Sequence, residues 1–354
     1  MSDTVSANVI GLGLIGGSVC LALKRAGFVV HGVDSDAGRV ADALGRSVID
    51  AEGLDPGARI TFVATPVNGI ADGVVRALAE TAGWVTDVGS VKAPVAGACS
   101  DPRFVPGHPM AGSELHGLDG ADASMFEGAV WVLTPTPSTS DDAFSGVAGI
   151  VSRLGAEVVA LAPERHDDIV AMVSHVPHLT AATLMGLAET RAEEHLALLR
   201  LAAGGFRDMT RIASGQPSIW IDICHQNKDA IVRTLNGLIE GLSGMRDVVE
   251  RGEAAELLGR LERARAARMN LPVRAGAVEN LVEVRIPIPD RPGAAAEVFS
   301  LSGDLGVNIL DFEVVHSAEG DRGVMVLVVR SEQIDVFRGG LLARGFRPAV
   351  AKLS

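Results

Sequence analysis

The beginning of the chain carries the pattern that most restricts its fold. A short apolar strand, expected over residues 7–10, leads into the loop Gly11-Leu12-Gly13-Leu14-Ile15-Gly16 and a helix over residues 19–26. A second strand, residues 28–33, ends at Asp34. This order of strand, G-x-G-x-x-G loop, helix, strand and acid is typical of a dinucleotide-binding βαβ unit. The glycines permit a tight turn, so a pyrophosphate can approach the amino end of the helix.

The same pattern indicates which dinucleotide is bound. Asp34 can accept hydrogen bonds from both ribose hydroxyls of an adenosine and would repel a 2′-phosphate, which favours NAD over NADP. Residues that follow the ends of later strands are expected to complete the cofactor contacts. The predicted NAD-binding residues are Gly11, Gly13, Leu14, Ile15, Gly16, Asp34, Thr65, Pro66 and Ser90.

Strands and helices continue to alternate through the first half of the chain. The alternation predicts a parallel, doubly wound, Rossmann-like α/β domain over residues 1–162, with ligands at the carboxyl ends of its strands. The expected strands cover residues 59–65, 84–88, 130–134 and 156–161, and the expected helices cover residues 69–80 and 141–154.

Two further domains are expected. Residues 163–270 are rich in Ala and Leu at helical spacing, which predicts an all-α domain for substrate binding and dimerisation. Its apolar faces are too extensive for one layer, so we expect the helices of two subunits to interlock in a homodimer. Residues 279–354 predict a small βαββαβ, ferredoxin-like unit. The expected helices of the middle domain cover residues 163–187, 191–203, 218–251 and 253–268.

Composition argues against several classes of function. The 31 basic and 44 acidic residues give a formal charge of −13, whereas nucleic-acid binding draws most of its affinity from a basic patch. The 3 cysteines form no C-x-x-C pair, which indicates reduced thiols in a cytoplasmic protein. No uncharged apolar run reaches the roughly 18 residues of a membrane span. We therefore expect neither nucleic-acid nor membrane partners.

Polar residues in three segments are candidates for chemistry. His108, between Gly107 and Pro109, is either a general base or merely a turn residue. Three histidines in residues 166–178 lack acidic or cysteine ligands at matching spacing, so we expect substrate contacts there and no metal. Arg211 follows a glycine break and is either a carboxylate clamp or half of a surface ion pair.

Several ordered motifs resemble the prephenate/arogenate dehydrogenase family over nearly the whole chain. The tail resembles an ACT domain, with Asp290-Arg291-Pro292-Gly293 before its first helix and residues 305–308 before its second strand. The family motifs are the glycine loop with Asp34, residues 87–92, Gly107-His-Pro-Met-Ala-Gly-Ser-Glu114, His166-Asp167, residues 174–178, residues 206–211 and residues 220–223.

The resemblance implies NAD-dependent oxidative decarboxylation of prephenate to 4-hydroxyphenylpyruvate. His108 then corresponds to the base that deprotonates the 4-hydroxyl, and Ser90 to the serine that orients both that base and the hydroxyl. Arg211 corresponds to the arginine that holds the substrate carboxylate. The remaining expected substrate contacts are His178, His175 and Lys92, with Glu114 and Trp220 at the rim of the pocket.

The resemblance of the tail implies an amino-acid effector, for which tyrosine is the first candidate and phenylalanine the second. Its expected contacts are Asp290, Arg291, Pro292, Gly293 and Asn308. The alternative is a purely structural dimerisation module.

Three alternative functions stay open at this point. Arogenate carries an amine in place of the keto group of prephenate, and Glu114 is a candidate partner for that amine. A non-catalytic NAD-binding regulator would keep the fold but not the set of His108, Ser90 and Arg211. A 2-hydroxy-acid dehydrogenase with an ACT tail would lack both the His108 segment and the all-helical middle domain.

Overall fold

The computed structural model of this chain describes residues 5–113, 115–192, 204–270, 281–289, 291, 293–316 and 322–352. The chain divides into two compact units, Met1–Gly259 and Arg260–Ser354. The predicted domain ranges, 1–162, 163–270 and 279–354, remain predictions, and the middle range crosses the division after Gly259.

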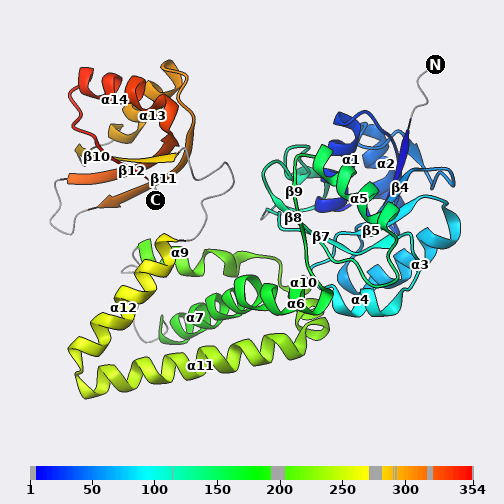
Figure 1. The fold of residues 1–354 in the computed structure, drawn as a ribbon, viewed down its shortest axis with the longest axis horizontal. Helices are drawn as coiled ribbons and strands as arrows, with labels where there is room; N and C mark the ends of the chain where they lie inside the picture. Colours follow the sequence, from blue (N-terminus) through cyan, green and yellow to red (C-terminus); the bar gives the residue numbers. More distant parts are fainter. Residues whose placement is uncertain are drawn as a thin grey trace. The chain divides into compact units, whose positions relative to one another are not determined.

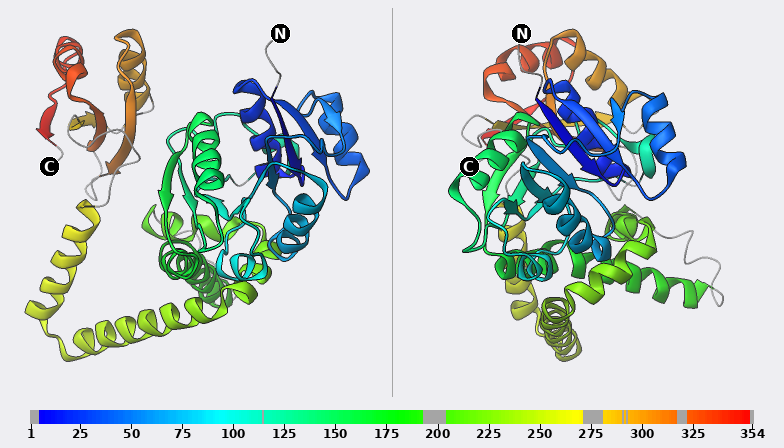
Figure 2. Two further views of the ribbon diagram at one scale, coloured as in Figure 1. Left: turned by 45° about the vertical axis from the view of Figure 1, so that its right-hand side comes forward. Right: turned by 90° about the vertical axis from the view of Figure 1, so that its right-hand side faces the viewer.

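The first unit contains a parallel sheet, whose earlier strands are blue in Figure 1 and Figure 2. Its strands lie in the order β3-β2-β1-β4-β5-β6. The order reverses direction between β1 and β4, and ligands of such sheets bind beside this switch point, at the carboxyl ends of the strands. The elements are β1 (Ser6–Ile10), α1 (Leu14–Arg25), β2 (Val29–Val33), α2 (Ala37–Gly45), β3 (Ala51–Glu52), β4 (Ile60–Val63), α3 (Ile70–Glu80), β5 (Trp84–Asp87), α4 (Ala93–Ala98) and β6 (Phe104–Val105).

The strands near residues 130 and 160 do not continue this sheet, so that part of the prediction is wrong. They form a second sheet, β7-β8-β9, in which β7 pairs antiparallel with β8 and β8 pairs parallel with β9. Pro106 separates β6 from β7 and has no N–H to pair, while its carbonyl accepts the Thr134 amide at 2.8 Å. The elements are β7 (Gly107–Pro109), β8 (Val130–Leu133), α5 (Asp141–Arg153) and β9 (Glu157–Ala160).

One hydrophobic core joins the two sheets. Trp131 of β8 is fully buried, and its ring lies 6.1 Å from that of Phe62 on β4 and 5.0 Å from that of Phe126. Aromatic pairs at these separations stabilise a core beyond the area that they bury. The core therefore fixes β7 and β8 against the carboxyl ends of the nucleotide-binding strands.

Helices follow from residue 163, and in Figure 1 α11 runs alongside α7. The predicted single helix over residues 218–251 is divided at Asn227, whose buried side chain donates to the Asp167 carbonyl at 2.9 Å. Most of the predicted helix over 191–203 lies outside the described residues. The elements are α6 (Pro163–Val170), a π-helical turn (Ala171–His175), α7 (Val176–Ala192), α9 (Gly204–Thr210), a 3₁₀ turn (Arg211–Ser214), α10 (Pro217–Gln226), α11 (Lys228–Arg251) and α12 (Ala254–Met269).

By length and composition alone, the continuous helical segment Pro163–Thr190 is apolar enough to cross a membrane. The same segment carries His166, Asp167, His175 and His178, all of which are buried. These polar side chains contact other protein groups within the first unit.

The second unit confirms the predicted βαββαβ order. Its antiparallel sheet has the strand order β11-β12-β10-β13, and α13 and α14 cover one face of the sheet (Figure 1). Val284, Leu327 and Phe337 are fully buried in its separate core. The elements are β10 (Leu281–Pro289), α13 (Ala294–Asp304), β11 (Ile309–His316), β12 (Arg322–Arg330), α14 (Ile334–Ala343) and β13 (Ala349–Lys352).

Candidate active site

The glycine loop after β1 is shaped for a close approach by a ligand. Gly11 has a φ of +96°, and a Cβ atom there would lie 2.5 Å from the Ala64 carbonyl oxygen. A Cβ atom at Gly16 would lie 1.8 Å from the Gly11 carbonyl oxygen, so neither position admits a side chain. Gly13 faces open space, and no side chain caps the start of α1. The first amides of α1 are therefore available for a phosphate.

Polar groups at the neighbouring strand ends complete a dinucleotide site. The Asp34 carboxylate accepts the Leu12 amide at 2.7 Å and the Asp36 amide at 2.9 Å, which holds it beside the glycine loop. The buried Thr65 hydroxyl after β4 has no hydrogen-bond partner within the described part of the chain. Pro66 follows it at the start of a 3₁₀ turn. These residues fit NAD, whose ribose hydroxyls and nicotinamide would supply the missing partners.

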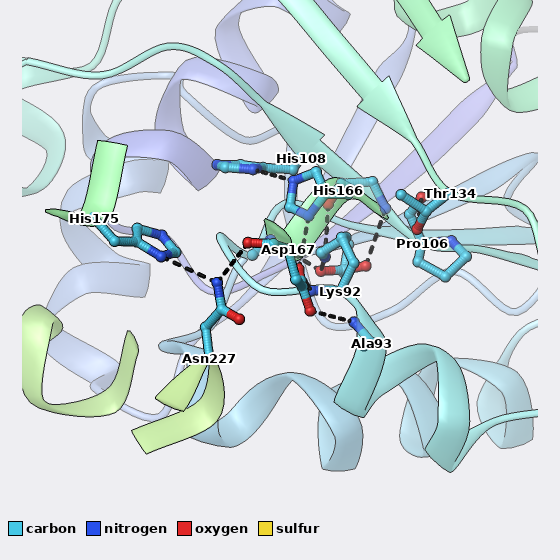
Figure 3. Close-up of polar contacts among 12 residues, drawn as sticks. Lys92, Ala93, Pro106, His108, Thr134, His166, Asp167, His175 and Asn227 are labelled. Carbon is cyan, nitrogen blue, oxygen red and sulfur yellow. Dashed lines mark hydrogen bonds and ion pairs between the residues drawn. The ribbon is translucent and has the colours of Figure 1, made fainter. Parts of the chain in front are cut away.

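His108 lies in the middle of β7 and heads a chain of hydrogen bonds (Figure 3). Its Nδ1 atom lies 2.8 Å from Nε2 of His166 on α6. Nδ1 of His166 lies 2.7 Å from Oδ1 of Asp167. His108 is half-buried, whereas His166 and Asp167 are buried. The structure thus places His108 on an ordered network, which a simple turn residue would not need.

Backbone amides hold the far end of this chain of hydrogen bonds. Oδ1 of Asp167 accepts the Lys92 amide and its Oδ2 accepts the Ala93 amide, both at 2.8 Å. These amides belong to the start of α4, where a negative charge is favoured. Nδ2 of Asn227 donates to the Asp167 carbonyl at 2.9 Å and to Nδ1 of His175 at 3.2 Å. The Lys92 and Ala93 amides and the His166 ring therefore fix the carboxylate, while Asn227, just before α11, holds the backbone of the same residue.

A buried ion pair holds the peptide before His108. The Lys92 ammonium contacts the Asp87 carboxylate and donates to the Gly107 carbonyl at 2.8 Å. Asp87 Oδ1 accepts the Gly107 amide at 3.1 Å. Both charged side chains are fully buried; burial lowers the pKa of Lys92, and Asp87 opposes that change. This geometry argues against the predicted direct contact of Lys92 with substrate, because its ammonium is already engaged inside the protein.

The surroundings of His108 favour its neutral form. Burial lowers its pKa well below 6.5, and His166, Lys92 and His175 act in the same direction. A neutral imidazole can accept a proton near neutral pH. Ser90, predicted to orient His108, is half-buried just after β5, and its hydroxyl makes no hydrogen bond to any described residue. In this structure His166 is the hydrogen-bonding partner of His108.

Predicted substrate residues gather between α7 and α10. The Trp220 ring stacks on His178 with 3.6 Å between centroids and an interplanar angle of 10°, and it meets His175 edge-on at 6.1 Å. Burial lowers the pKa of His178, and a hydrogen bond to the Ile212 backbone opposes this. The exposed Arg211 is the residue before Ile212. The predicted rim residue Glu114 lies outside the described residues.

Sequence reasoning gave no individual role to His166, Asp167, Asp87 or Asn227. A His-Asp pair inside an apolar helical segment was the available signal for the first two. No group of three or more His, Cys, Asp or Glu side chains suited to a metal ion occurs in the described ranges.

Comparisons with known proteins agree with this architecture. Residues 19–160 match the family described as prephenate dehydrogenase, nucleotide-binding domain, and residues 162–263 match prephenate dehydrogenase, dimerization domain. Prephenate dehydrogenase of Bacillus subtilis (strain 168) is 33% identical over 94% of this chain and 93% of its own.

Two solved structures share the fold. Prephenate dehydrogenase of A. aeolicus, in complex with hydroxyphenyl propionate and NAD+, is 27% identical with a TM-score of 0.71, covering 76% of this chain and 99% of its own. Synechocystis arogenate dehydrogenase is 29% identical with a TM-score of 0.65, covering 75% of this chain and 99% of its own. From its sequence, its fold and its site, the chain belongs to the prephenate dehydrogenase family.

Proposed function

We propose that this protein oxidises and decarboxylates prephenate with NAD, forming 4-hydroxyphenylpyruvate, carbon dioxide and NADH. The observation that carries the proposal is the position of His108 at the end of a buried hydrogen-bond network, next to the carboxyl end of β5, where burial lowers the pKa of its ring. Mixing the purified protein with NAD and prephenate tests it. NADH and 4-hydroxyphenylpyruvate are expected in equal amounts, and no NADH would exclude the function.

The reaction needs a base at the hydroxyl of the cyclohexadienol ring. His108 accepts the proton of this ring hydroxyl. At the same time, the ring carbon that bears the hydroxyl loses its hydrogen as a hydride, with both bonding electrons. NAD, when bound, supplies the hydride acceptor. Breakage of the bond to the ring carboxylate then releases carbon dioxide and leaves an aromatic ring. The protein contributes the base, the orientation of the ring and a site that holds its anionic groups.

The residues between α7 and α10 are suited to hold the substrate. Arg211 supplies a planar cation that can bind two carboxylate oxygens at once. His178 and Trp220, stacked 3.6 Å apart, provide a flat surface against which a ring can pack. Ser90 and His175 complete the proposed set of substrate contacts, and Ser90 also serves the cofactor side.

Arogenate is the alternative substrate, since one structural relative is an arogenate dehydrogenase. The two substrates differ only in an amine against a keto group, so discrimination requires a group near the side chain. Glu114 is our candidate for that group. Steady-state rates on both substrates, for wild type and Glu114→Gln, decide the preference. Activity on 2-hydroxy acids alone would indicate a 2-hydroxy-acid dehydrogenase instead.

We propose a homodimer formed through the helical region, in line with the dimerization-domain match. A largely apolar groove of about 940 Å³ between α7, α9 and α11 is lined by Met172, Val176, Ala181, Met209 and Leu238, among others. Ile239 and Leu242 on α11 are each 58% exposed. Light scattering should give twice the chain mass, and Ile239→Glu should lower it towards that of a monomer.

We propose that the small C-terminal unit is an ACT-like sensor of tyrosine. Gly293, immediately before α13, has a φ of +90°, and Arg291 pairs with Glu297 at 2.7 Å. Gln333 donates to the Gly306 carbonyl at 3.0 Å and accepts the Asn308 amide at 3.4 Å. Asp290 and Pro292 lie outside the described residues. Removal of residues 276–354 should abolish any response to tyrosine and preserve catalysis; an unchanged response would place the effector at the active site.

A further inference from the structure

The hydrogen bonds around Asp167 determine where the protons of the two histidines lie. An ionised carboxylate only accepts hydrogen bonds, so Nδ1 of His166, 2.7 Å from Asp167, carries a proton and donates it. In neutral His166 the Nε2 atom is then an acceptor. Nδ1 of His108, 2.8 Å away, must therefore carry the proton of that contact. This leaves Nε2 of His108 unprotonated.

We propose that Asp167, acting through His166, fixes the tautomer and the ring orientation of His108, so that its Nε2 atom is the base. His166 and Asp167 are positioning residues in this proposal, which rests on the proposed function for the identity of the proton that His108 accepts. With the opposite tautomers, Nε2 of His166 would donate to Nδ1 of His108, and that contact would keep a proton. The lone pair of His166 Nδ1 would then face the lone pairs of the Asp167 carboxylate, and this second contact would lose its hydrogen bond.

Burial makes the arrangement specific. His166 is fully buried and Asp167 is 5% exposed, so water cannot readily replace either partner. The Asp167 carboxylate receives three hydrogen bonds, from Nδ1 of His166 and from the amides of Lys92 and Ala93 (Figure 3). Rotation of the carboxylate would break contacts with α4, so the network has one favourable arrangement.

The charged groups around His108 act with this network. Lys92 and Asp87 lie behind the Gly107 peptide as an ion pair, and His175 is linked to Asp167 through the Asn227 amide. Only Asp167 among these groups is connected to the ring of His108 through His166. A proton that reaches His108 creates an imidazolium, whose Nδ1 proton stays directed at His166 and towards the carboxylate beyond it.

Kinetics of two His166 variants test the positioning role. His166→Gln can place an amide oxygen near the position of Nε2 and still accept from His108, whereas His166→Leu cannot. We expect His166→Leu to lower kcat by about 10²–10⁴-fold with little change in the KM for NAD, and His166→Gln to recover most of that loss. Asp168→Asn is the matched control, because Asp168 pairs with Arg233 at the surface. A His166→Leu enzyme with wild-type kcat would overturn the proposal.

Nitrogen-15 NMR of the histidine rings tests the tautomer without substrate. The chain has 9 histidines, so the signals can be assigned by comparison with His108→Asn and His166→Leu. We expect protonated Nδ1 and unprotonated Nε2 in both His108 and His166 near neutral pH. A proton on Nε2 of His108 would overturn the proposal even if the enzyme oxidises prephenate. Conversely, the expected tautomers in a protein inactive on prephenate would refute the proposed function alone.

Discussion

Asp87 accepts the amide of Gly107 at 3.1 Å, while Lys92, its partner in a buried ion pair, donates to the carbonyl of the same residue at 2.8 Å. Both polar groups of the Gly107 backbone are thereby held, and a shift of the backbone before His108 would break its hydrogen bonds to two buried charged side chains. We refer to these two hydrogen bonds to Gly107 as the Gly107 clip, and we infer that the clip fixes the position of the neighbouring base, His108.

Removal of Lys92 tests the clip. Lys92→Met leaves Asp87 buried without its cation, and the free energy of unfolding should fall by about 3–5 kcal/mol. Lys24→Met is the control: Lys24 pairs with Asp50 at a partly exposed position, where loss of an ion pair costs about 1 kcal/mol or less. Urea unfolding measures both. Equal losses would show that the buried pair has no special structural role.

Arg211 is expected to act on the substrate and not on the cofactor. Arg211→Met removes a bidentate partner of a carboxylate, so the KM for prephenate should rise by about 10–100-fold. The KM for NAD should change little. Arg207→Met, an exposed position on α9, is the control. Equal changes in both Michaelis constants would indicate a structural role for Arg211.

Asp34 is expected to set the preference for NAD. Asp34→Ser removes the carboxylate beside the glycine loop, so the KM for NAD should rise and its advantage over NADP should shrink. Asp36→Ser removes a charge two residues away and keeps a side chain able to cap α2. The ratio of kcat/KM for NAD and NADP measures the effect. An unchanged ratio in Asp34→Ser would contradict the assignment.

His175 should make the fold less stable in mild acid. Burial lowers its pKa from 6.5 to about 4, and its Nδ1 atom accepts a hydrogen bond from Asn227. Between these pH values the unfolded chain binds a proton that folded His175 does not. The free energy of unfolding should therefore decrease as the pH falls from 6.5 towards 4, with up to about 1.4 kcal/mol per pH unit from this residue.

Urea unfolding at pH 7.5 and pH 5 measures this dependence. His175→Asn should show a smaller decrease than wild type, whereas His225→Asn, at an exposed position on α10, should keep the wild-type decrease. A His175→Asn protein with an undiminished decrease would show that other groups cause it.

The nucleotide-binding unit could be predicted because its signals are local. Gly11, Gly16 and Asp34 lie within one βαβ unit, and each answers a steric or electrostatic requirement of that unit. The βαββαβ order of the tail followed equally from the period of its apolar residues. A local sequence pattern does not indicate which residue of a distant segment will form a hydrogen bond with it.

The active site depends on such distant contacts. His108 and His166 are 58 residues apart, and the sequence around each predicts neither the pairing nor its direction. The sequence did not predict β7. Pro106 lies between β6, the last strand of the first sheet, and β7, which pairs with β8 in the second sheet. The residues around His108 give no sign of this change of sheet. The break at Asn227 was missed because its cause is a contact with the Asp167 carbonyl.

The role of His108 is tested most directly by the rate of NADH formation from prephenate in His108→Asn, with NAD binding measured on the same protein. We predict a kcat lower by about 10²–10⁴-fold and an unchanged dissociation constant for NAD. The wild-type kcat/KM should rise with pH through a group whose pKa lies below 6.5, since the base must be neutral and its pKa is lowered by burial. A His108→Asn enzyme that keeps most of the wild-type turnover would contradict the assignment of His108 as the base.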